Sequence, residues 1–231
     1  MLLYYITDRS QFPGDETARR RAMLENIAQA ARCGVDYIQL REKDLNPREL
    51  EMLARDAVAI VHQLRTGHQL RTGNQKLKTG VLVNSRTDIA VACAADGVHL
   101  RSHDMSAAEV RKIWSRSGAG ALARVTVGVS CHTPTDVANA AEQGADFAVF
   151  GPIFEKKSVP DTHPAGLEAL RQACREKIPV LALGGVTSQN AEACIQAGAA
   201  GIAGIRLFQE NEMSRVVTEL RQPTSRGRPG G

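Results

Sequence analysis

Aromatic side chains are scarce in this sequence, whose 231 residues include one Trp, three Tyr and five Phe. Proteins that bind single-stranded nucleic acid stack bases on exposed aromatic rings, and those that bind duplexes carry a basic stripe or patch. Here 29 Lys and Arg residues nearly balance 25 Asp and Glu residues, which leaves a formal net charge of +4. We therefore expect no nucleic-acid partner.

Long apolar runs and paired cysteines are also missing. The first residues read MLLYYITD, so the apolar stretch reaches an aspartate at position 8, whereas a membrane span needs about 20 apolar residues and a signal peptide needs a basic leader. The five cysteines are scattered and form no Cys-x-x-Cys pair, which favours reduced thiols over a disulfide framework or a zinc site. We expect a cytoplasmic protein with no membrane partner.

The sequence does contain a regular alternation of short apolar runs and amphipathic segments. The apolar runs show no two-residue alternation, which is typical of parallel strands covered on both faces. We expect strands at residues 2–6, 36–40, 80–84, 97–100, 125–129, 147–150, 179–183 and 201–205. We expect helices at residues 16–32, 47–65, 87–94, 106–116, 134–143, 165–175, 188–197 and 210–220. Eight strand–helix units predict an α/β fold, a single (β/α)8 TIM barrel over residues 1–221.

Two kinds of local pattern accompany these units. AARCGVDYIQL, AAEQGADFAVF and CIQAGAAGIAGI share an order of helix, glycine, acidic or small residue, and strand, which we interpret as punctuation of the repeat. Residues 63–79 contain QLRTGH, then QLRTGN, then QKLKTG, and we expect a basic surface insertion there because added loop length costs little. Residues 222–231, QPTSRGRPGG, have the composition of a disordered tail.

The strongest local signal for a binding site is LALGGVTSQN, in which Gly184 and Gly185 stand between an apolar strand and an expected helix. Reactive residues in a (β/α)8 barrel gather at the C-terminal ends of its strands. Glycines let backbone amides approach an anion, and a helix N-terminus adds partial positive charge. The stretch predicts a phosphate site, with a tight turn that needs glycine as the alternative.

Other strand exits carry single candidates. Arg41 and Lys43 share a face with Gln39 after the second strand; two cations suit a polyanion, or pair with neighbouring acids. Asp104 is either a Mg²⁺ ligand beside phosphate oxygens or a helix cap. His132 is either a general acid or base or a neutral hydrogen-bonding group.

The loop after the sixth strand, GPIFEKKSVPD, carries the adjacent lysines Lys156 and Lys157. They are either contacts for an anionic substrate or part of a solvated turn.

Taken in order, these strand exits resemble the thiamin phosphate synthase family, which includes the TenI-type thiazole tautomerases. The resemblance runs from about residue 4 to residue 206. The matching stretches are YYITD (4–8), YIQLREKD (37–44), VNSRTDIA (83–90), ADGVHL (95–100) with Asp104, GVSCHT (128–133), GADFAVFGPIF (144–154) and PVLALGGVTSQNA (179–191).

The resemblance implies a (β/α)8 enzyme that joins hydroxymethylpyrimidine pyrophosphate to thiazole phosphate and releases pyrophosphate, with Mg²⁺ as cofactor. It implies an ionising mechanism, in which pyrophosphate leaves and the thiazole nitrogen attacks a pyrimidine carbocation. Such a site must neutralise a departing polyanion and exclude water. Both partners are small phosphorylated substrates, and the oligomeric state is not predicted.

The resemblance also implies roles for residues, carried over by position. Gln39 would contact the pyrimidine, Asn84 the pyrophosphate–pyrimidine substrate, and Ser130 the leaving group or the pyrimidine amine. Arg41 and Lys43 would bind the pyrophosphate. The remaining roles are Mg²⁺ binding by Asp104 and thiazole phosphate binding by Gly185 and the backbone near Ile205 and Arg206.

Three positions depart from the family pattern. Synthases usually show Asn-Asp where this chain has Asn84 and Ser85, so one expected carboxylate for Mg²⁺ is missing. They also carry Thr-x-Thr-Lys where this chain reads KKSV from residue 156, and a serine where it has Arg206. Lys156, Lys157 and Ser158 are candidate replacements, since lysine contacts phosphate as a point charge.

These departures leave two alternatives beside the synthase. Ser85 and the Phe-Glu pair at 154–155 resemble the tautomerase branch, in which His132 would shuttle a proton on the thiazole carboxylate without a metal. Gln39 and Lys43 favour the synthase, because a tautomerase has no pyrimidine pyrophosphate to bind. The second alternative is a non-catalytic member that binds a phosphate ligand.

Overall fold

The computed structural model describes residues 1–72, 78–117, 124–155 and 163–222, with the backbone alone at residues 68–72. Eight parallel strands pair in chain order and close on themselves. The strands are β1 (Leu2–Ile6), β2 (Tyr37–Leu40), β3 (Gly80–Asn84), β4 (Gly97–Leu100), β5 (Thr126–Cys131), β6 (Phe147–Phe150), β7 (Val180–Ala182) and β8 (Gly201–Gly204). The predicted (β/α)8 barrel is confirmed, and every predicted strand boundary lies within two residues of the observed one.

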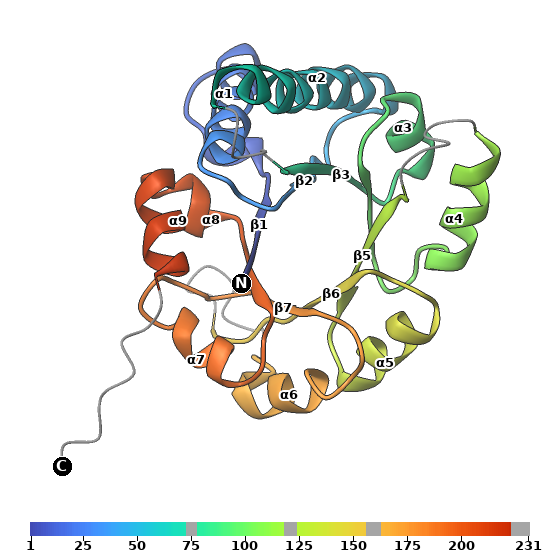
Figure 1. Ribbon diagram of the computed structural model, residues 1–231, viewed down its shortest axis with the longest axis vertical. Coiled ribbons are helices and arrows are strands. Elements are labelled where there is room, and N and C mark those ends of the chain that lie inside the picture. The colour runs from blue at the N-terminus through green and yellow to red at the C-terminus, as the bar shows by residue number, and fades with distance from the viewer. Residues whose placement is uncertain (73–77, 118–123, 156–162, 223–231) are drawn as a thin grey trace.

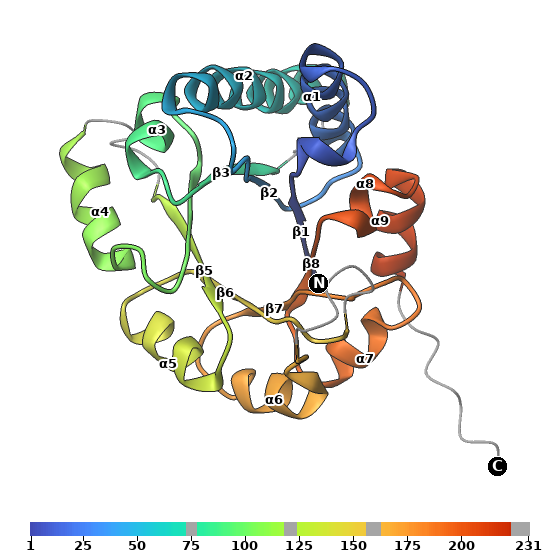
Figure 2. The same ribbon diagram turned by 180° about the vertical axis from the view of Figure 1, so that it is seen from behind.

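The helices form a ring outside the strands, which Figure 1 shows from one side and Figure 2 from behind. They are α1 (Glu16–Arg32), α2 (Pro47–Thr72), α3 (Thr87–Ala92), α4 (Ala107–Arg116), α5 (Pro134–Glu142), α6 (Gly166–Ala173), α7 (Ala191–Gln196), α8 (Arg206–Gln209) and α9 (Met213–Arg221), with a short 3-10 turn, η1 (Arg9–Gln11). In the part of the chain that the structure covers, no helix combines the length and apolar character that a membrane crossing needs.

Three helices differ from the sequence prediction by more than two residues at one end. α2 continues to Thr72, so the first part of the segment at 63–79, predicted as a surface insertion, extends this helix; Gly67 within it costs about 1 kcal/mol, which a long helix tolerates. α7 begins at Ala191 and not at residue 188, because the Asn190 side chain accepts a hydrogen bond from the Thr187 amide (2.7 Å) and closes a turn first. The helix predicted at 210–220 is α9, which begins at Met213, and the short α8 before it was not predicted.

Apolar side chains fill the inside of the barrel as well as the layer between strands and helices. The inner cluster is Tyr4, Ile6, Leu82, Phe147, Val149, Leu181 and Ala203. Within it the Phe147 ring stacks on Tyr37 and meets Tyr4 edge to face, both with ring centroids 5.3 Å apart. The barrel is therefore a packed core, and a ligand must bind at one of its ends.

The N-terminal ends of three strands are held by one repeated arrangement. An aspartate directly precedes each of β2, β4 and β6. It accepts a hydrogen bond from an amide of the preceding strand and pairs with an arginine of a helix. The amide bonds are Leu3 to Asp36 (2.8 Å), Val81 to Asp96 (2.8 Å) and Val127 to Asp146 (2.7 Å). The arginines are Arg221, Arg65 and Arg111, at 2.8, 2.8 and 2.9 Å from these carboxylates. We call these the aspartate–arginine clamps.

Candidate functional site

The exits of β2 and β3 are joined by buried amide groups. Gln39 is 1% exposed, and its Nε2 donates to Asn84 Oδ1 (2.8 Å), while Asn84 Nδ2 donates to Ser85 Oγ (3.1 Å). Gln39 Oε1 is buried and accepts no hydrogen bond from any residue that the structure describes. An unmatched buried acceptor costs free energy, so this oxygen is suited to a ligand that brings a donor.

Asp104 continues this row of side chains. Partial burial alone would raise the pKa of its carboxyl, but hydrogen bonds from the Ser85 hydroxyl and from Arg101 lower it, so Asp104 is a carboxylate at neutral pH. The Arg101 amide donates at 2.8 Å. The helix that follows is capped by Ser106 and Glu109 in a capping box, so the alternative reading of Asp104 as the cap of α4 is wrong.

Ser85 holds an uncommon backbone conformation at the centre of this row, with φ of 58°. Few residues other than glycine adopt it, and such strain gathers at functional sites. The Ser85 amide donates to the His99 carbonyl (2.8 Å), which fixes the strained turn against β4. Ser85 thus hydrogen-bonds to Asp104 at the position where synthases usually carry a second aspartate.

The acids beside Arg41 and Lys43 bind a different arginine. Glu42 is buried between the exits of β1 and β2, where Arg9 lies 3.2 Å from it. Arg9 also binds Asp44 at 2.7 Å. The Arg41 amide donates to the Thr7 hydroxyl (3.0 Å), whose own proton goes to Glu42 (2.6 Å). These contacts anchor the strand exit that carries both predicted cations.

His99 of β4 lies inside the barrel at 2% exposure. Its Nδ1 is 3.1 Å from the Tyr4 hydroxyl and its Nε2 is 2.8 Å from Ser130 Oγ. Burial first, and then the positive charge of Arg41, lower the pKa of His99 to about 3. The imidazole is therefore neutral at physiological pH.

His132 follows β5 and lies at the exit of β6. Its exposed ring donates from Nδ1 to the Gly151 carbonyl (2.7 Å), and its amide donates to Asp136 (2.9 Å). The bond to Gly151 leaves Nε2 as the nitrogen that can exchange a proton.

Gly184 and Gly185 are required by the packing of the loop after β6. Both have positive φ, 96° and 67°. A Cβ on Gly184 would lie 2.7 Å from Pro152, and one on Gly185 would lie 2.7 Å from the Phe154 Cβ. The predicted alternative, a tight turn that needs glycine, is therefore confirmed.

The same two glycines also shape an anion site. In the described part of the chain, the amide N–H groups of Gly184, Gly185 and Val186 donate to no acceptor. Successive free amides in such a turn form a concave nest for anions. The two glycines at the β7 exit thus serve both the packing of the loop after β6 and a candidate phosphate site. The helix N-terminus predicted at residue 188 does not contribute, because α7 begins at Ala191.

The residues that follow β8 lie next to the β7 exit, because the two strands pair. Ile205 caps α8, and its side chain packs against the inner cluster. Arg206 is half exposed, with Nε 3.7 Å from Glu210. Lys156, Lys157 and Ser158 of the loop after β6 lie outside the described residues.

No preformed metal centre accompanies these groups, since the described residues contain no cluster of three or more His, Cys, Asp or Glu side chains that could hold a metal. Magnesium is commonly bound by one or two carboxylates together with substrate phosphates. Asp104, with the Asn84 and Ser85 oxygens beside it, fits the arrangement in which one carboxylate binds Mg²⁺ together with substrate phosphates.

The sequence pattern assigned no role to Tyr4 and His99. Inside the barrel the Tyr4 hydroxyl contacts His99, and His99 contacts Ser130. The available signal was a histidine within the apolar strand GVHL. Sequence analysis also read Ser85 only as a lost ligand, although the side chain links Asn84 to Asp104.

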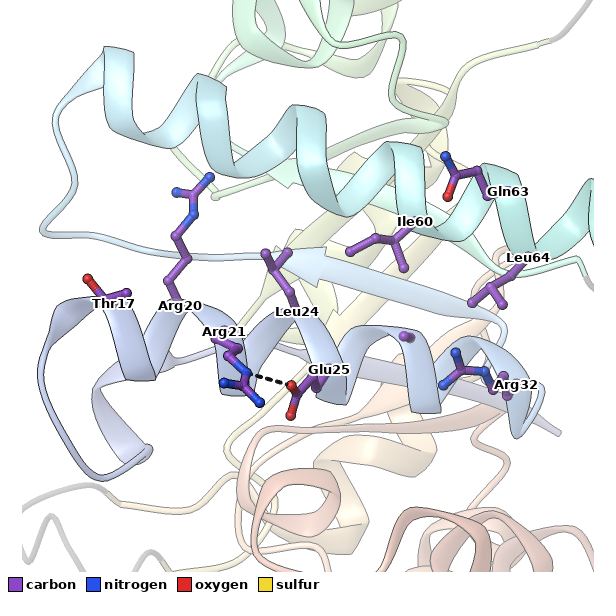
Figure 3. A pocket seen from close by; sticks show the side chains of 10 residues that line it. Thr17, Arg20, Arg21, Leu24, Glu25, Arg32, Ile60, Gln63 and Leu64 are labelled. Atoms are coloured by element: carbon purple, nitrogen blue, oxygen red, sulfur yellow. Dashed lines mark hydrogen bonds and ion pairs between the residues drawn. The ribbon is translucent and has the colours of Figure 1, made fainter.

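A separate groove lies on the outer surface between α1 and α2, away from the strand exits (Figure 3). It is lined by apolar side chains with arginines at its rim, among them Leu24, Ile60, Leu64, Arg20 and Arg32. Arg20 pairs with Asp56 across it (2.7 Å).

Comparisons with known proteins place the chain among related sequences. A family model described as thiamine monophosphate synthase matches residues 3–208. The chain is 36% identical over 205 residues to a thiamine-phosphate synthase of Albidiferax ferrireducens, covering 87% of this chain and 81% of the relative. It is 35% identical over 206 residues to a thiamine-phosphate synthase of Roseiflexus, covering 88% and 76%. The solved structure of a thiamine phosphate pyrophosphorylase from Pyrococcus furiosus matches with a TM-score of 0.73 and 27% identity, covering 95% and 93%.

Proposed function

The chain belongs to the thiamine monophosphate synthase family, and on that premise we propose that it is a thiamine-phosphate synthase. It would be a transferase of thiamine biosynthesis that couples hydroxymethylpyrimidine pyrophosphate to thiazole phosphate and releases pyrophosphate. Its substrates would be small phosphorylated molecules, and the cytoplasmic location remains a prediction from the sequence.

The observation that carries this proposal is the unmatched oxygen of Gln39. The Gln39 Oε1 is buried at the β2 exit, while the Nε2 of the same side chain is held by Asn84. An aminopyrimidine offers the donor that this acceptor lacks, and a buried acceptor discriminates strongly against ligands without one. A tautomerase that acts on the thiazole alone has no group for this position.

The charged groups at the mouth support the departure of pyrophosphate. Arg41 and Lys43 would neutralise the charge that develops on the leaving oxygen. The packed aromatic floor of Tyr4, Tyr37 and Phe147 excludes water from below, which protects a carbocation from hydrolysis. The free amides of residues 184–186 would hold the thiazole phosphate.

Magnesium would be held by Asp104 together with oxygens of the pyrophosphate. When bound, it would supply positive charge to the leaving group. Ser85 contributes no second carboxylate, so Lys156, Lys157 and Ser158 are proposed to replace part of the lost charge and the lost hydroxyl contacts.

The runner-up is a TenI-type tautomerase, in which His132 would shuttle the proton. The contact with Gly151 orients the His132 ring and leaves Nε2 available for proton transfer. The third candidate, a non-catalytic phosphate binder, would use the Gly184–Val186 amides without the Gln39 contact.

One experiment separates the three candidates. The pure protein is incubated with both synthase substrates and Mg²⁺, and separately with the thiazole carboxylate phosphate. The proposal expects thiamine phosphate to form and to be lost in Arg41→Ala and Asp104→Ala, while Arg171→Ala on the outer face of α6 stays active. Metal-independent tautomerisation that disappears in His132→Ala would establish the runner-up, and binding without turnover would leave the third candidate.

The two lysines of the β6 loop are tested separately. Replacing Lys156 and Lys157 together by alanine should raise the KM for the pyrophosphate substrate at least about 10-fold, the scale of a lost charge-assisted hydrogen bond. The KM for thiazole phosphate should change much less. Equal KM values in the variant and the unaltered protein would identify the lysines as solvated.

A further inference from the structure

Three side chains from three strands form a hydrogen-bonded row inside the barrel. The Tyr4 hydroxyl of β1 lies 3.1 Å from His99 Nδ1, and His99 Nε2 lies 2.8 Å from the hydroxyl of Ser130 on β5. Tyr4 is fully buried and His99 is 2% exposed, whereas Ser130 is half-buried at the end of the row. The row therefore runs from the closed interior to the candidate site.

The proton positions in this row follow from the burial of Tyr4. The only hydrogen-bond partner of its hydroxyl, among the described residues, is His99 Nδ1. If Nδ1 carried a proton, the phenol would have to accept, and its own buried O–H would have no acceptor, which is unfavourable for a buried polar group. The lower-energy arrangement has the phenol donating to Nδ1.

That arrangement sets the other side of the ring. A neutral imidazole carries one proton, and the low pKa of His99 keeps it neutral. With Nδ1 accepting from Tyr4, the proton lies on Nε2 and is donated to Ser130 Oγ. The hydroxyl proton of Ser130 cannot point back toward His99 and is directed to the half-buried side, where the site opens.

We propose that Tyr4 and His99 are positioning residues that make Ser130 a hydrogen-bond donor to an oxygen of the leaving pyrophosphate. This rests on the proposed synthase function and specifies one part of it. Resemblance alone leaves Ser130 beside either the leaving group or the pyrimidine amine. A hydroxyl whose proton faces the ligand needs an acceptor there, and the pyrophosphate supplies anionic acceptors whose charge grows as the bond breaks.

The hydrogen bond from Ser130 should therefore affect kcat and KM differently. A hydrogen bond that strengthens as charge develops on the leaving group contributes to kcat more than to substrate binding. Tyr4 touches no substrate in this arrangement and acts only through His99 and Ser130. Removing the Tyr4 hydroxyl should therefore matter only while the Ser130 hydroxyl is present.

The kinetic test is a double-mutant cycle of Tyr4→Phe and Ser130→Ala, with formation of thiamine phosphate as the readout. Tyr4→Phe is expected to lower kcat by about 5-fold, the effect of one hydrogen bond, with the KM for thiazole phosphate unchanged. In the Ser130→Ala background the same change is expected to have no further effect. An equal loss in both backgrounds would overturn the proposal, because it would show that Tyr4 acts independently of Ser130.

Tyr5→Phe is the matched control. Tyr5 is equally buried, its ring packs against Phe208 on the other side of β1, and its hydroxyl has no hydrogen-bond partner among the described residues. Its kcat should equal that of the unaltered protein, which would show that removing a buried tyrosine hydroxyl does not by itself lower turnover.

A second readout does not depend on turnover. In the ¹⁵N spectrum of histidine-labelled protein, the His99 signals, assigned by their disappearance in His99→Gln, should show an unprotonated Nδ1 and a protonated Nε2. The reverse tautomer would refute the donor role of Ser130. If the tautomer is as expected but the unaltered protein makes no thiamine phosphate, the proposed function fails and the hydrogen-bonded row stands.

Discussion

Gln39 is the residue at which burial and polarity conflict most clearly. Its Nε2 is satisfied by Asn84 at 2.8 Å, while Oε1 is buried with no partner. An apolar side chain of the same length would remove the unmatched oxygen, so the polar residue costs stability in the free protein. The cost is recovered when a ligand donates to it, which is the trade between stability and function seen at binding sites.

Gln39→Met tests this directly. The variant should raise the KM for the pyrimidine pyrophosphate at least about 10-fold, because a hydrogen bond to a buried partner is lost. The KM for thiazole phosphate should stay unchanged. Gln29→Met on the exposed face of α1 serves as the control, and parallel increases in both KM values would contradict the assignment of Gln39 to the pyrimidine.

His99 makes the stability of the fold depend on pH. Its pKa is about 3 in the folded protein and about 6.5 in an unfolded chain, so the unfolded chain binds the proton first as pH falls. Stability is therefore highest above pH 6.5 and is lost toward pH 3, by up to about 1.4 kcal/mol per pH unit. Urea unfolding at about pH 7 and pH 5 should differ by about 2 kcal/mol more in the unaltered protein than in His99→Gln. The same pH dependence in both proteins would show that another group is responsible.

At the residue scale, the sequence predicted the polar side chains at the strand exits but not their hydrogen bonds. Gln39, Asn84, Ser85 and Asp104 form one connected row, which requires knowing that β2, β3 and β4 are neighbours. Tyr4 and His99 lie within apolar strands, where a polar residue normally indicates nothing more than a satisfied core position. Their roles depend on which side chains face them across the barrel.

The strands and their connections define the next scale. Strand positions were predictable because parallel strands buried on both faces are apolar throughout. Helix ends were less so, because competing local hydrogen bonds decide them. The Asn190 side chain delays α7 by closing a turn with Thr187. Arg65, the last residue of the predicted part of α2, pairs with Asp96 (2.8 Å) just before the helix continues to Thr72.

The aspartates that directly precede β2, β4 and β6 have a physical explanation at the level of these elements. Asp36, Asp96 and Asp146 each tie a strand amide to a helix arginine, at the N-terminal end of the barrel. Residues on this N-terminal face of the barrel contribute to stability, whereas the C-terminal face carries the active site.

Asp146→Asn is expected to lower the free energy of unfolding by about 1–3 kcal/mol, since two arginines lose a partly buried carboxylate. Arg111 and Arg124 both lie 2.9 Å from it. The kcat below the unfolding temperature should be unchanged, because the clamp is remote from the strand exits. The control, Asp56→Asn, breaks a more exposed pair with Arg20 and should cost less than about 1 kcal/mol. Equal losses of stability in the two variants would show that the clamp is an ordinary surface pair.

For the whole molecule, the closed barrel brings together side chains that are far apart in the sequence. The candidate pyrimidine and pyrophosphate contacts come from the exits of β2 to β5 and from the segment after β6, and the candidate thiazole phosphate contacts from β7 and β8. Each half of the site thus occupies one side of the mouth, and the two substrates would meet between them. The barrel topology alone predicts this grouping; the tautomer of His99 and the strain at Ser85 need coordinates.

The central claim is that this mouth couples two substrates and does not merely rearrange one. The most direct test mixes the pure protein with hydroxymethylpyrimidine pyrophosphate, thiazole phosphate and Mg²⁺, and follows thiamine phosphate and pyrophosphate together. Both products should form in equal amounts, and Arg41→Ala should abolish the formation of both. Absence of thiamine phosphate from the unaltered protein, with metal-independent tautomerisation of the thiazole carboxylate phosphate in its place, would contradict the claim.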